Sequence, residues 1–367
     1  MTDWRAIREE FPGLRRWTYL NTATYGQMPR CAAAAVAEHF ARRDEFACGD
    51  FLEWFDQADQ VRSSIARLVN CTSDDVAFFQ NASSALSVVT AAIDWQPGDR
   101  VLALEHEFPN LVYCGAALEQ RGVIFDQVPW ERFEETLTSR TRLVMASTVN
   151  YITGFRLPVE RLVKLCRDAG AFSYVDGTQS VGALMFDCEA VQPDMLSVDG
   201  YKWLLCPNGA GFAYVRPEVR KWLPPSTIGW RSDKRWREVS SLHHGSPEFK
   251  ESAERYEGGI LPFPAIFGMG ASVNMMLEIG PAAIEQRVLE LAAYLRERLI
   301  YAGGRIANED TPIVAARFEG VDAGKLVSSL REKRVLVSAR HGNLRVSADF
   351  YNDEADIDTL MAALKEL

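Results

Sequence analysis

Residues 171–203 read AFSYVDGTQSVGALMFDCEAVQPDMLSVDGYKW and contain two short apolar runs, each followed by polar residues. The first run, AFSYV, leads into Asp176, and the second, DMLSVD, comes just before Lys202. Runs of this length that are rich in apolar and aromatic residues predict buried strands. In an open α/β sheet the ligand lies beyond the carboxyl ends of the strands, so we expect Asp176 and Lys202 to belong to a functional site.

The same pattern extends on both sides of this stretch, from about residue 75 to residue 216. The strand-like runs are DDVAFF, RVLALE, GVIFDQV, RLVMAS, AFSYVD, DMLSVD and GFAYV. Helical patterns occupy residues 83–93, 110–120 and 158–170, and Gly170 supplies a helix stop. Alternating strands and helices predict an α/β fold with a mixed, mostly parallel sheet.

The remainder of the chain predicts a second, smaller unit. We expect a large domain at residues 21–262, and a small α+β domain formed by residues 1–20 and 263–367, with a long connecting helix from about 264 to 301. The segment from about 220 to 262 is rich in Trp, Arg and Ser and is longer than a simple connection needs, which indicates a function. Its aromatic side chains require burial.

Composition narrows the class of protein. The chain has 367 residues, of which 47% are hydrophobic and 25% charged, as in packed globular proteins of about two domains. A net charge of −10 opposes binding to nucleic acid or anionic membranes. The charged beginning MTDWRAIREEF is unlike a signal peptide, and no apolar run approaches the ~20 residues of a membrane span, so we expect a cytoplasmic protein. Its seven scattered cysteines include no C-x-x-C pair, and we expect no disulfide framework and no metal site.

Three elements point to one cofactor. A buried carboxylate such as Asp176 can hold a pyridine nitrogen in its protonated form, and a desolvated lysine such as Lys202 can form an imine with an aldehyde. Ser83 and Ser84 open a predicted helix after a strand, where hydroxyls and backbone N–H groups bind anions. Together they predict pyridoxal 5′-phosphate (PLP).

The segments YVDGTQSVGA and VDGYKWLLCPNGAGFAYV resemble the PLP-binding core of the class V aminotransferases. This fold-type I group includes cysteine desulfurases, isopenicillin N epimerase and kynureninase. Four further segments match in the family's order: YLNTATYG, QNASSAL, EFPN and LRVSADFYND. The resemblance implies a fold-type I PLP-dependent transferase fold and a homodimer with active sites at the interface.

The resemblance also implies roles for individual residues. Lys202 would bind PLP and carry the proton at the substrate's Cα, Asp176 would pair with the pyridine nitrogen, and Gln179 would donate to the phenolate oxygen. Phe108 would stack on the ring and counts with Lys202 and Asp176 as catalytic, with His106 as its rival for stacking. The resemblance further implies that Arg345 binds the α-carboxylate of the substrate with its guanidinium group. The other implied substrate-binding residues are Tyr25 and Asn150. The other implied cofactor-binding residues are Ala82, Ser83, Ser84, Tyr201 and Trp230, of which Trp230 would contact the phosphate bound by the partner subunit.

Some residues depart from particular branches of the family. No cysteine lies shortly before Arg345, because residues 339–344 read ARHGNL and the last cysteine is Cys206. This disfavours a persulfide-forming cysteine desulfurase, which needs a nucleophilic thiol there. The loop TVNYITG is similar to that of kynureninases, yet Gln179 replaces their histidine, and Gly259-Ile260 replaces a Gly-Thr pair of the partner-subunit phosphate loop.

These features predict an enzyme that acts at Cα of an amino acid or amino-acid conjugate. We expect an aminotransferase or an isopenicillin N epimerase-like enzyme, with a PLP-dependent C–S or C–C lyase as the alternative. Epimerisation requires a second acid opposite Lys202, for which Tyr25, Tyr151 and His341 are candidates. A binding protein that kept only the fold is disfavoured, because Lys202, Asp176 and Arg345 are all present.

Overall fold

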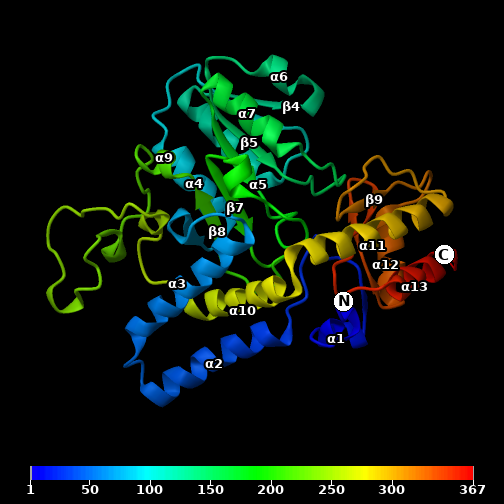
Figure 1. Ribbon diagram of the computed structural model, residues 1–367. Coiled ribbons are helices and arrows are strands. Elements are labelled where there is room, and N and C mark those ends of the chain that lie inside the picture. The colour runs from blue at the N-terminus through cyan, green and yellow to red at the C-terminus, as the bar shows by residue number, and fades with distance from the viewer. Residues whose placement is uncertain (1, 367) are drawn as a thin grey trace.

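A seven-stranded mixed sheet lies at the centre of the larger part of the molecule (Figure 1), in a computed structural model that describes residues 2–366. Its strand order is β2-β8-β7-β6-β5-β3-β4, and β8 alone runs against its neighbours. The strands are β2 (Val76–Phe79), β3 (Arg100–Leu104), β4 (Ile124–Val128), β5 (Thr141–Ser147), β6 (Phe172–Asp176), β7 (Met195–Asp199) and β8 (Gly211–Val215). Each corresponds to one predicted run, so the predicted mixed, mostly parallel sheet is confirmed.

Both faces of this sheet are buried, which explains why its strands are apolar runs without polar alternation. Val144 and Val175 face one hydrophobic cluster, whereas Leu143 and Met145 face another on the opposite side. The parallel register pairs Asp176 with Ser147 and with Ser197, so polar residues at the strand ends meet at one edge.

The predicted crossover helices are present. They are α4 (Ala82–Ala92), α5 (Pro109–Leu118) and α7 (Val159–Ala169). Asn81 caps α4 by accepting a hydrogen bond from the Ser84 N–H, and α7 stops at Gly170, whose φ of 70° is in the left-handed region. The shorter helices are α1 (Trp4–Arg8), α6 (Phe133–Thr136), α8 (Cys188–Val191) and α9 (Pro217–Arg220).

The prediction of one continuous helix at 264–301 is wrong in one respect. The structure has two helices there, α10 (Phe263–Ile279) and α11 (Pro281–Tyr301). The break falls at Gly280, which has a φ of +97° and is followed by a proline that lacks an N–H. Helix α10 packs against α2 (Arg30–Phe46) and α3 (Phe51–Leu68), whereas α11 runs along the C-terminal part (Figure 1).

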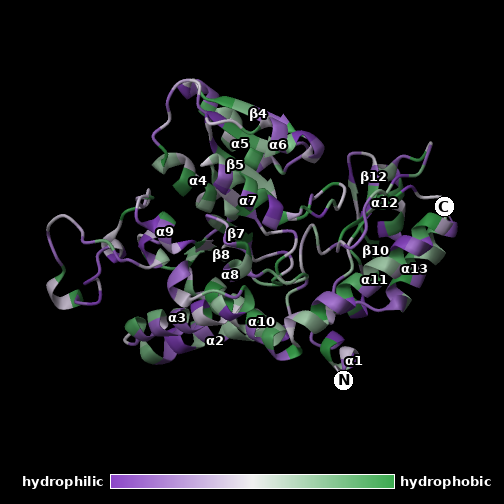
Figure 2. Ribbon diagram, turned by 45° about the horizontal axis from the view of Figure 1, so that its top comes forward, coloured by the Kyte–Doolittle hydropathy of each residue, from purple (hydrophilic) through white to green (hydrophobic). Residues whose placement is uncertain are grey.

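The C-terminal part is built on a small antiparallel sheet. Its order is β11 (Ser338–Arg340), β12 (Asn343–Val346) and β9 (Val314–Ala316), covered by α11, α12 (Ala323–Glu332) and α13 (Glu354–Lys365). Helices α11 and α13 carry both hydrophobic and hydrophilic residues, as helices with one buried face do (Figure 2). Near the N-terminus, β1 (Thr18–Tyr19) pairs in parallel with β10 (Val335–Leu336).

The aromatic residues of the 220–262 segment are only partly buried. Trp236 packs against Phe55 with ring centroids 4.6 Å apart, while Trp222 and Trp230 stay exposed by 53% and 36%. The buried Arg231 holds the segment by pairing with Glu254 and Glu257. Within residues 2–366, no helix combines the length and apolar character needed to cross a bilayer.

Candidate active site

Lys202 follows β7 and is buried, with only 6% of its surface exposed. Its Nζ lies 5.2 Å from the centroid of the Phe108 ring and 5.6 Å from that of Tyr201. Burial lowers the pKa of this amine to about 8, against the opposing effect of Asp176 and Asp199. A substantial neutral fraction near pH 7 to 8 makes the amine able to attack an aldehyde.

Asp176 ends β6 and is also buried. Its Oδ1 accepts a 2.9 Å hydrogen bond from the backbone N–H of Thr178. Among residues 2–366 no lysine or arginine nitrogen lies within 4.0 Å of this carboxylate. A buried carboxylate without a protein cation suits a cationic group on a ligand, such as a protonated pyridine nitrogen.

Sequence reasoning missed Asp199, the last residue of β7. Its Oδ1 accepts a 2.8 Å hydrogen bond from the N–H of Ala82, the first residue of α4. Burial, and then the charge of Asp176, raise its pKa to about 6. The segment VDGYK could have predicted this position, because Asp199 ends an apolar strand three residues before Lys202. Both residues therefore lie at the carboxyl edge of the sheet.

The N-terminus of α4 presents the predicted phosphate-binding residues. Ser83 is exposed there, and the Ser84 hydroxyl donates a 3.0 Å hydrogen bond to Asn81 Oδ1. The carbonyl of Ala82 accepts a hydrogen bond from the Tyr174 hydroxyl, which fixes this turn to the sheet. The backbone N–H groups of a first helical turn suit a phosphate.

Gln179 is buried and its amide is oriented by two contacts. Its Oε1 accepts a 3.1 Å hydrogen bond from the Trp203 indole, and its Nε2 donates to the carbonyl of Ala23 at 3.0 Å. The second proton on Nε2 is left for a ligand acceptor, as the predicted contact with a phenolate oxygen requires.

The Phe108 ring lies against Lys202, whose Nζ is 5.2 Å from the ring centroid. The Phe108 ring meets Tyr151 edge-on, with centroids 5.2 Å apart, whereas His106 lies 6.5 Å from the ring of His341. His106 has a left-handed φ of 62°, and its carbonyl accepts a hydrogen bond from Asn150 Nδ2.

Asn150 uses its side chain to shape the neighbouring turn. Its Oδ1 accepts hydrogen bonds from the backbone N–H groups of Ile152 and Thr153, each at 3.0 Å. The Asn150 amide therefore holds the loop that carries Tyr151. Its predicted contact with the substrate would have to form in addition to these hydrogen bonds, and it stays a prediction.

Sequence reasoning also missed Glu107, which is buried beneath this loop. Its carboxylate accepts hydrogen bonds from the N–H and the hydroxyl of Ser147, at 2.7 and 2.5 Å. Burial raises its pKa to about 7. Glu107 therefore fastens the loop that presents Phe108 to the end of β5.

Arg345 lies on β12, with 1% of its surface exposed. It donates from Nε to the Ser338 hydroxyl, from Nη1 to the carbonyl of Tyr151 and from Nη2 to the Thr24 hydroxyl, at 3.0, 2.7 and 2.6 Å. None of these acceptors is charged, and burial lowers the pKa of Arg345 to about 9. A carboxylate ligand is the natural counter-ion for such a group.

The two remaining predicted residues differ in position. Tyr25 lies beside Tyr201, with ring centroids 5.1 Å apart, and its hydroxyl contacts Asn208. Trp230 packs instead on Phe55 and Trp236, away from this cluster. Its predicted contact, with the phosphate site of a partner subunit, stays a prediction.

These residues fit PLP in three ways. The Lys202 amine, which has no ion-pair partner among residues 2–366, suits the aldehyde. The Asp176 carboxylate suits the ring nitrogen, and the N-terminus of α4 suits the phosphate.

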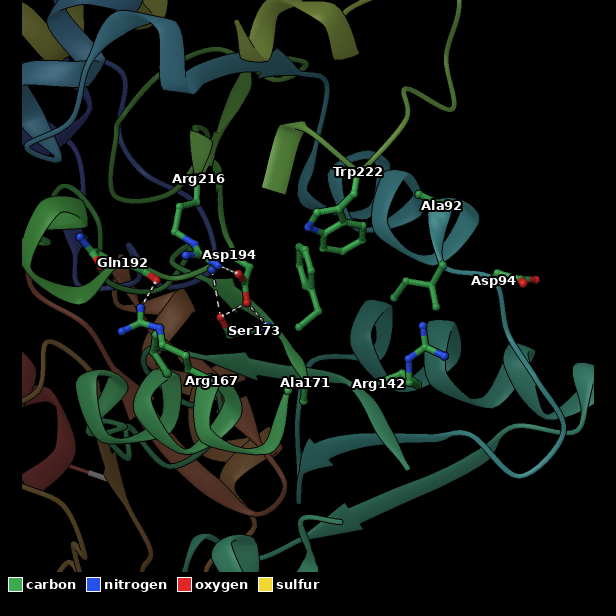
Figure 3. A pocket seen from close by; sticks show the side chains of 14 residues that line it. Ala92, Asp94, Arg142, Arg167, Ala171, Ser173, Gln192, Asp194, Arg216 and Trp222 are labelled. Carbon is green, nitrogen blue, oxygen red and sulfur yellow. Dashed lines mark hydrogen bonds and ion pairs between the residues drawn. The ribbon is translucent and has the colours of Figure 1, made fainter. Parts of the chain in front are cut away.

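A pocket of about 540 Å³ lies elsewhere, at the amino ends of the central strands (Figure 3). Asp194 accepts hydrogen bonds from Ser173 there and pairs with Arg216 at 2.5 Å. Neither Lys202 nor Asp176 lines it.

The fold and site define a PLP-dependent enzyme of fold type I. The family described as Aminotransferase class-V matches residues 50–360, and the chain belongs to this family. Isopenicillin N epimerase from Streptomyces clavuligerus is 28% identical over 100% of this chain and 99% of its own length. A probable cysteine desulfurase from Methanothermobacter thermautotrophicus is 25% identical over 98% of this chain and 97% of its own.

Solved structures agree on the fold. A C-DES mutant with glycine covalently linked to the PLP cofactor has a TM-score of 0.91 at 22% identity, with 100% of both chains covered. The cysteine desulfurase CsdA from Escherichia coli has a TM-score of 0.88 at 20% identity, covering 100% of this chain and 98% of its own. The predicted family, fold class and cofactor are therefore confirmed.

Proposed function

We propose that this enzyme acts at Cα of an amino acid or amino-acid conjugate, as an aminotransferase or as an epimerase similar to isopenicillin N epimerase. One observation carries the proposal: the buried Lys202 amine lies 5.2 Å from the centroid of the Phe108 ring, and the charges of Asp176 and Arg345 both act on its pKa. That arrangement supports the proposal that Lys202 acts as the base, Asp176 as the partner of the ring nitrogen and Arg345 as the carboxylate binder. The relative from Streptomyces clavuligerus, named an isopenicillin N epimerase, supports the same chemistry.

Each residue has a distinct task. Bound PLP supplies an electron sink that weakens the bonds at Cα of the attached amino acid. Arg345 has five N–H groups, of which three go to protein acceptors, and the remaining two match one α-carboxylate. Lys202 takes the proton from Cα, and Asp176 keeps a proton on the ring nitrogen.

Aminotransfer and epimerisation differ in what they require besides Lys202. Aminotransfer needs Lys202 alone as the proton carrier, whereas epimerisation needs an acid on the other face of Cα. The Tyr151 hydroxyl and His341 Nε2 approach each other to 3.5 Å beside Phe108, which makes this pair a candidate acid. Tyr25, next to Tyr201, is the other candidate.

A C–S or C–C lyase is the second candidate, and the position of the cysteines distinguishes it from a cysteine desulfurase. Strands β11 and β12 are joined by the tight turn His341-Gly342, which leaves no room for a cysteine-bearing loop before Arg345. Cys206 is buried, its Sγ donates to the carbonyl of Ala210, and burial raises the pKa of its thiol. A sulfur atom cleaved from a substrate would thus leave without forming a protein persulfide, which disfavours a cysteine desulfurase.

A homodimer is part of the proposal. Phe40 and Phe46 of α2 and Ile260 of the 220–262 segment are exposed by 49%, 48% and 67%. Apolar side chains of this size on a soluble protein favour burial against another copy. Sedimentation analysis of the PLP-loaded protein should give twice the chain mass, and a monomer at all concentrations would contradict this.

The test of function compares the purified protein with Lys202→Ala and with a control, Lys164→Ala, whose lysine is exposed by 74% on α7. Wild type and control should show the visible absorption of lysine-bound PLP, and Lys202→Ala should not. The proteins are then given L- and D-amino acids with and without a keto acid. Conversion of the added keto acid into its amino acid, without free ammonia, indicates aminotransfer, and inversion seen by chiral chromatography indicates epimerisation. Release of free ammonia or sulfide without an added keto acid indicates a lyase. A wild type that does not bind PLP would refute the proposal.

A further inference from the structure

Two arginines, not one, converge on a single hydroxyl next to the site. Arg345 of β12 and Arg340 of β11 both direct Nη2 at Thr24 Oγ1, at 2.6 and 3.3 Å. The Thr24 hydroxyl donates its own proton to Asn21 Oδ1, so its lone pairs are turned toward the two guanidinium groups. Sequence reasoning assigned a role to Arg345 alone.

Neither guanidinium has a carboxylate partner. Among residues 2–366, no Asp or Glu oxygen lies within 4.0 Å of Arg340 or Arg345. By contrast, the equally buried Arg231 has two carboxylates, those of Glu254 and Glu257. The absence of acids is therefore specific to this site and is not a general feature of buried arginines in this chain.

The charges of the two arginines act on each other and on the lysine. Arg340 is the largest charged influence that lowers the pKa of Arg345, and both arginines also lower the pKa of Lys202. Like charges held together in a partly buried site raise its free energy until an anion neutralises them.

A single substrate carboxylate would leave N–H donors of the two arginines unused. The two free N–H groups of Arg345 already match a single α-carboxylate. Arg340 gives one N–H to the carbonyl of Ala339 and one to Thr24, so three of its five N–H groups are free. These point to a second acceptor of similar chemistry.

We propose that Arg340 forms a second anion subsite and that the substrate carries, besides its α-carboxylate, a second carboxylate in its side chain or acyl part. This inference rests on the proposed action at Cα, because Arg345 must take the α-carboxylate. The substrate class is then an acidic amino acid or an amino-acid conjugate that ends in a carboxylate.

Binding of two simple probes to the PLP-loaded protein tests the subsite. Glutarate carries two carboxylates and butyrate one, and their affinities are read from changes in the visible absorption of the bound cofactor. We expect wild type to prefer glutarate by at least tenfold, and Arg340→Gln to lose most of that preference. Arg305→Gln is the matched control, because Arg305 is an exposed arginine of the same part of the chain, paired with Glu319. It should keep the wild-type preference.

Turnover gives a second, independent measurement. L-Glutamate and L-norvaline have the same chain length and differ in a terminal carboxylate against a methyl group. The ratio of their kcat/KM values should favour glutamate in wild type and fall at least tenfold in Arg340→Gln, with partial recovery in Arg340→Lys.

Two other outcomes would contradict the proposal of a second anion subsite. Equal losses for glutarate and butyrate would mean that Arg340 shares the α-carboxylate with Arg345, and no loss for either would mean that it binds no anion. Both results would leave the visible absorption of lysine-bound PLP intact. Failure of the proposed function would instead appear as a wild type without that absorption, or without any reaction at Cα.

Discussion

The carboxyl group of Asp199 accepts a 2.8 Å hydrogen bond from the backbone N–H of Ala82, at the first turn of α4. The same helix end is the predicted phosphate site, so a carboxyl group and a phosphate would share one set of donors. Two anions in that position repel each other, whereas a protonated carboxyl can donate to the phosphate. Burial and Asp176 raise the pKa of Asp199 to about 6, so the protonated form is within reach near neutral pH.

Asp199→Asn should therefore tighten PLP binding, and more so at high pH. The amide keeps an oxygen for the Ala82 N–H, adds an N–H donor and carries no charge. Above pH 6 the wild type must take up a proton to bind the phosphate, so the variant's advantage should grow by up to tenfold per pH unit. The measurement is PLP affinity of the apoprotein between pH 6 and 9. Because the charge of Asp199 also raises the pKa of Lys202, the contribution of the lysine is measured separately.

Pyridoxal, which lacks the phosphate, is the control ligand for this experiment. Any effect of Asp199→Asn through the pKa of Lys202 appears with pyridoxal as well, and the change in pyridoxal affinity should be smaller than the change in PLP affinity. An equal effect on pyridoxal and PLP would show that Asp199 acts on the ring or on Lys202 rather than on the phosphate.

The sequence predicted the central sheet well, because a strand buried on both faces must be an uninterrupted apolar run. Phe172–Asp176 and Met195–Asp199 are examples, and their ends also locate Asp176 and Lys202. The break at Gly280 was missed, since Gly-Pro within an apolar helical pattern reads as a continuous helix until the two halves pack on different parts of the molecule.

The parts of the site that escaped prediction depend on contacts between distant segments. Arg340 matters because Thr24 lies beside it, and Glu107 matters because it reaches Ser147. Neither contact leaves a periodic pattern or a motif in the sequence. By contrast, Arg345 was identified from LRVSADFYND, and the structure shows why it lacks a protein counter-ion.

Replacing Phe108 should weaken cofactor binding, whereas replacing His106 should not. Phe108→Leu keeps an apolar side chain but removes the aromatic face that lies 5.2 Å from Lys202 Nζ. Loss of a stacking contact of about 1 kcal/mol corresponds to a roughly fivefold weaker PLP affinity. His106→Gly is the matched variant, because glycine adopts the φ of 62° without strain. A larger loss in His106→Gly would assign the stacking role to the histidine.

Replacing Arg345 should affect both substrate binding and the lysine. Arg345→Gln removes the charge that binds the α-carboxylate, and kcat/KM should fall by about a hundredfold or more for every amino acid used. Because the charge of Arg345 lowers the pKa of Lys202, its removal should raise that pKa above about 8. PLP attachment to the apoprotein should then require a higher pH, and an unchanged pH profile would contradict the electrostatic link.

Asp349 provides a test of stability away from the reacting groups. It lies after β12, fully buried, with Oδ1 accepting from the Phe350 N–H and Oδ2 without a hydrogen-bond partner among the described residues. Burial raises its pKa from 3.8 to about 8. The folded protein therefore holds a proton that the unfolded chain releases, so this group's stabilising effect is complete below pH 3.8 and is lost as the pH rises toward 8.

Asp349→Asn should remove this loss, since the amide is neutral at every pH. Between pH 5 and 8 the wild type's free energy of unfolding should fall relative to the variant's by up to about 1.4 kcal/mol per pH unit. Urea unfolding midpoints of the PLP-loaded proteins at several pH values measure the difference, with Asp44→Asn on the exposed face of α2 as the control. If the wild type and Asp349→Asn have the same pH dependence, the Asp349 carboxyl is ionised in the folded protein, and a cation or water must reach its Oδ2.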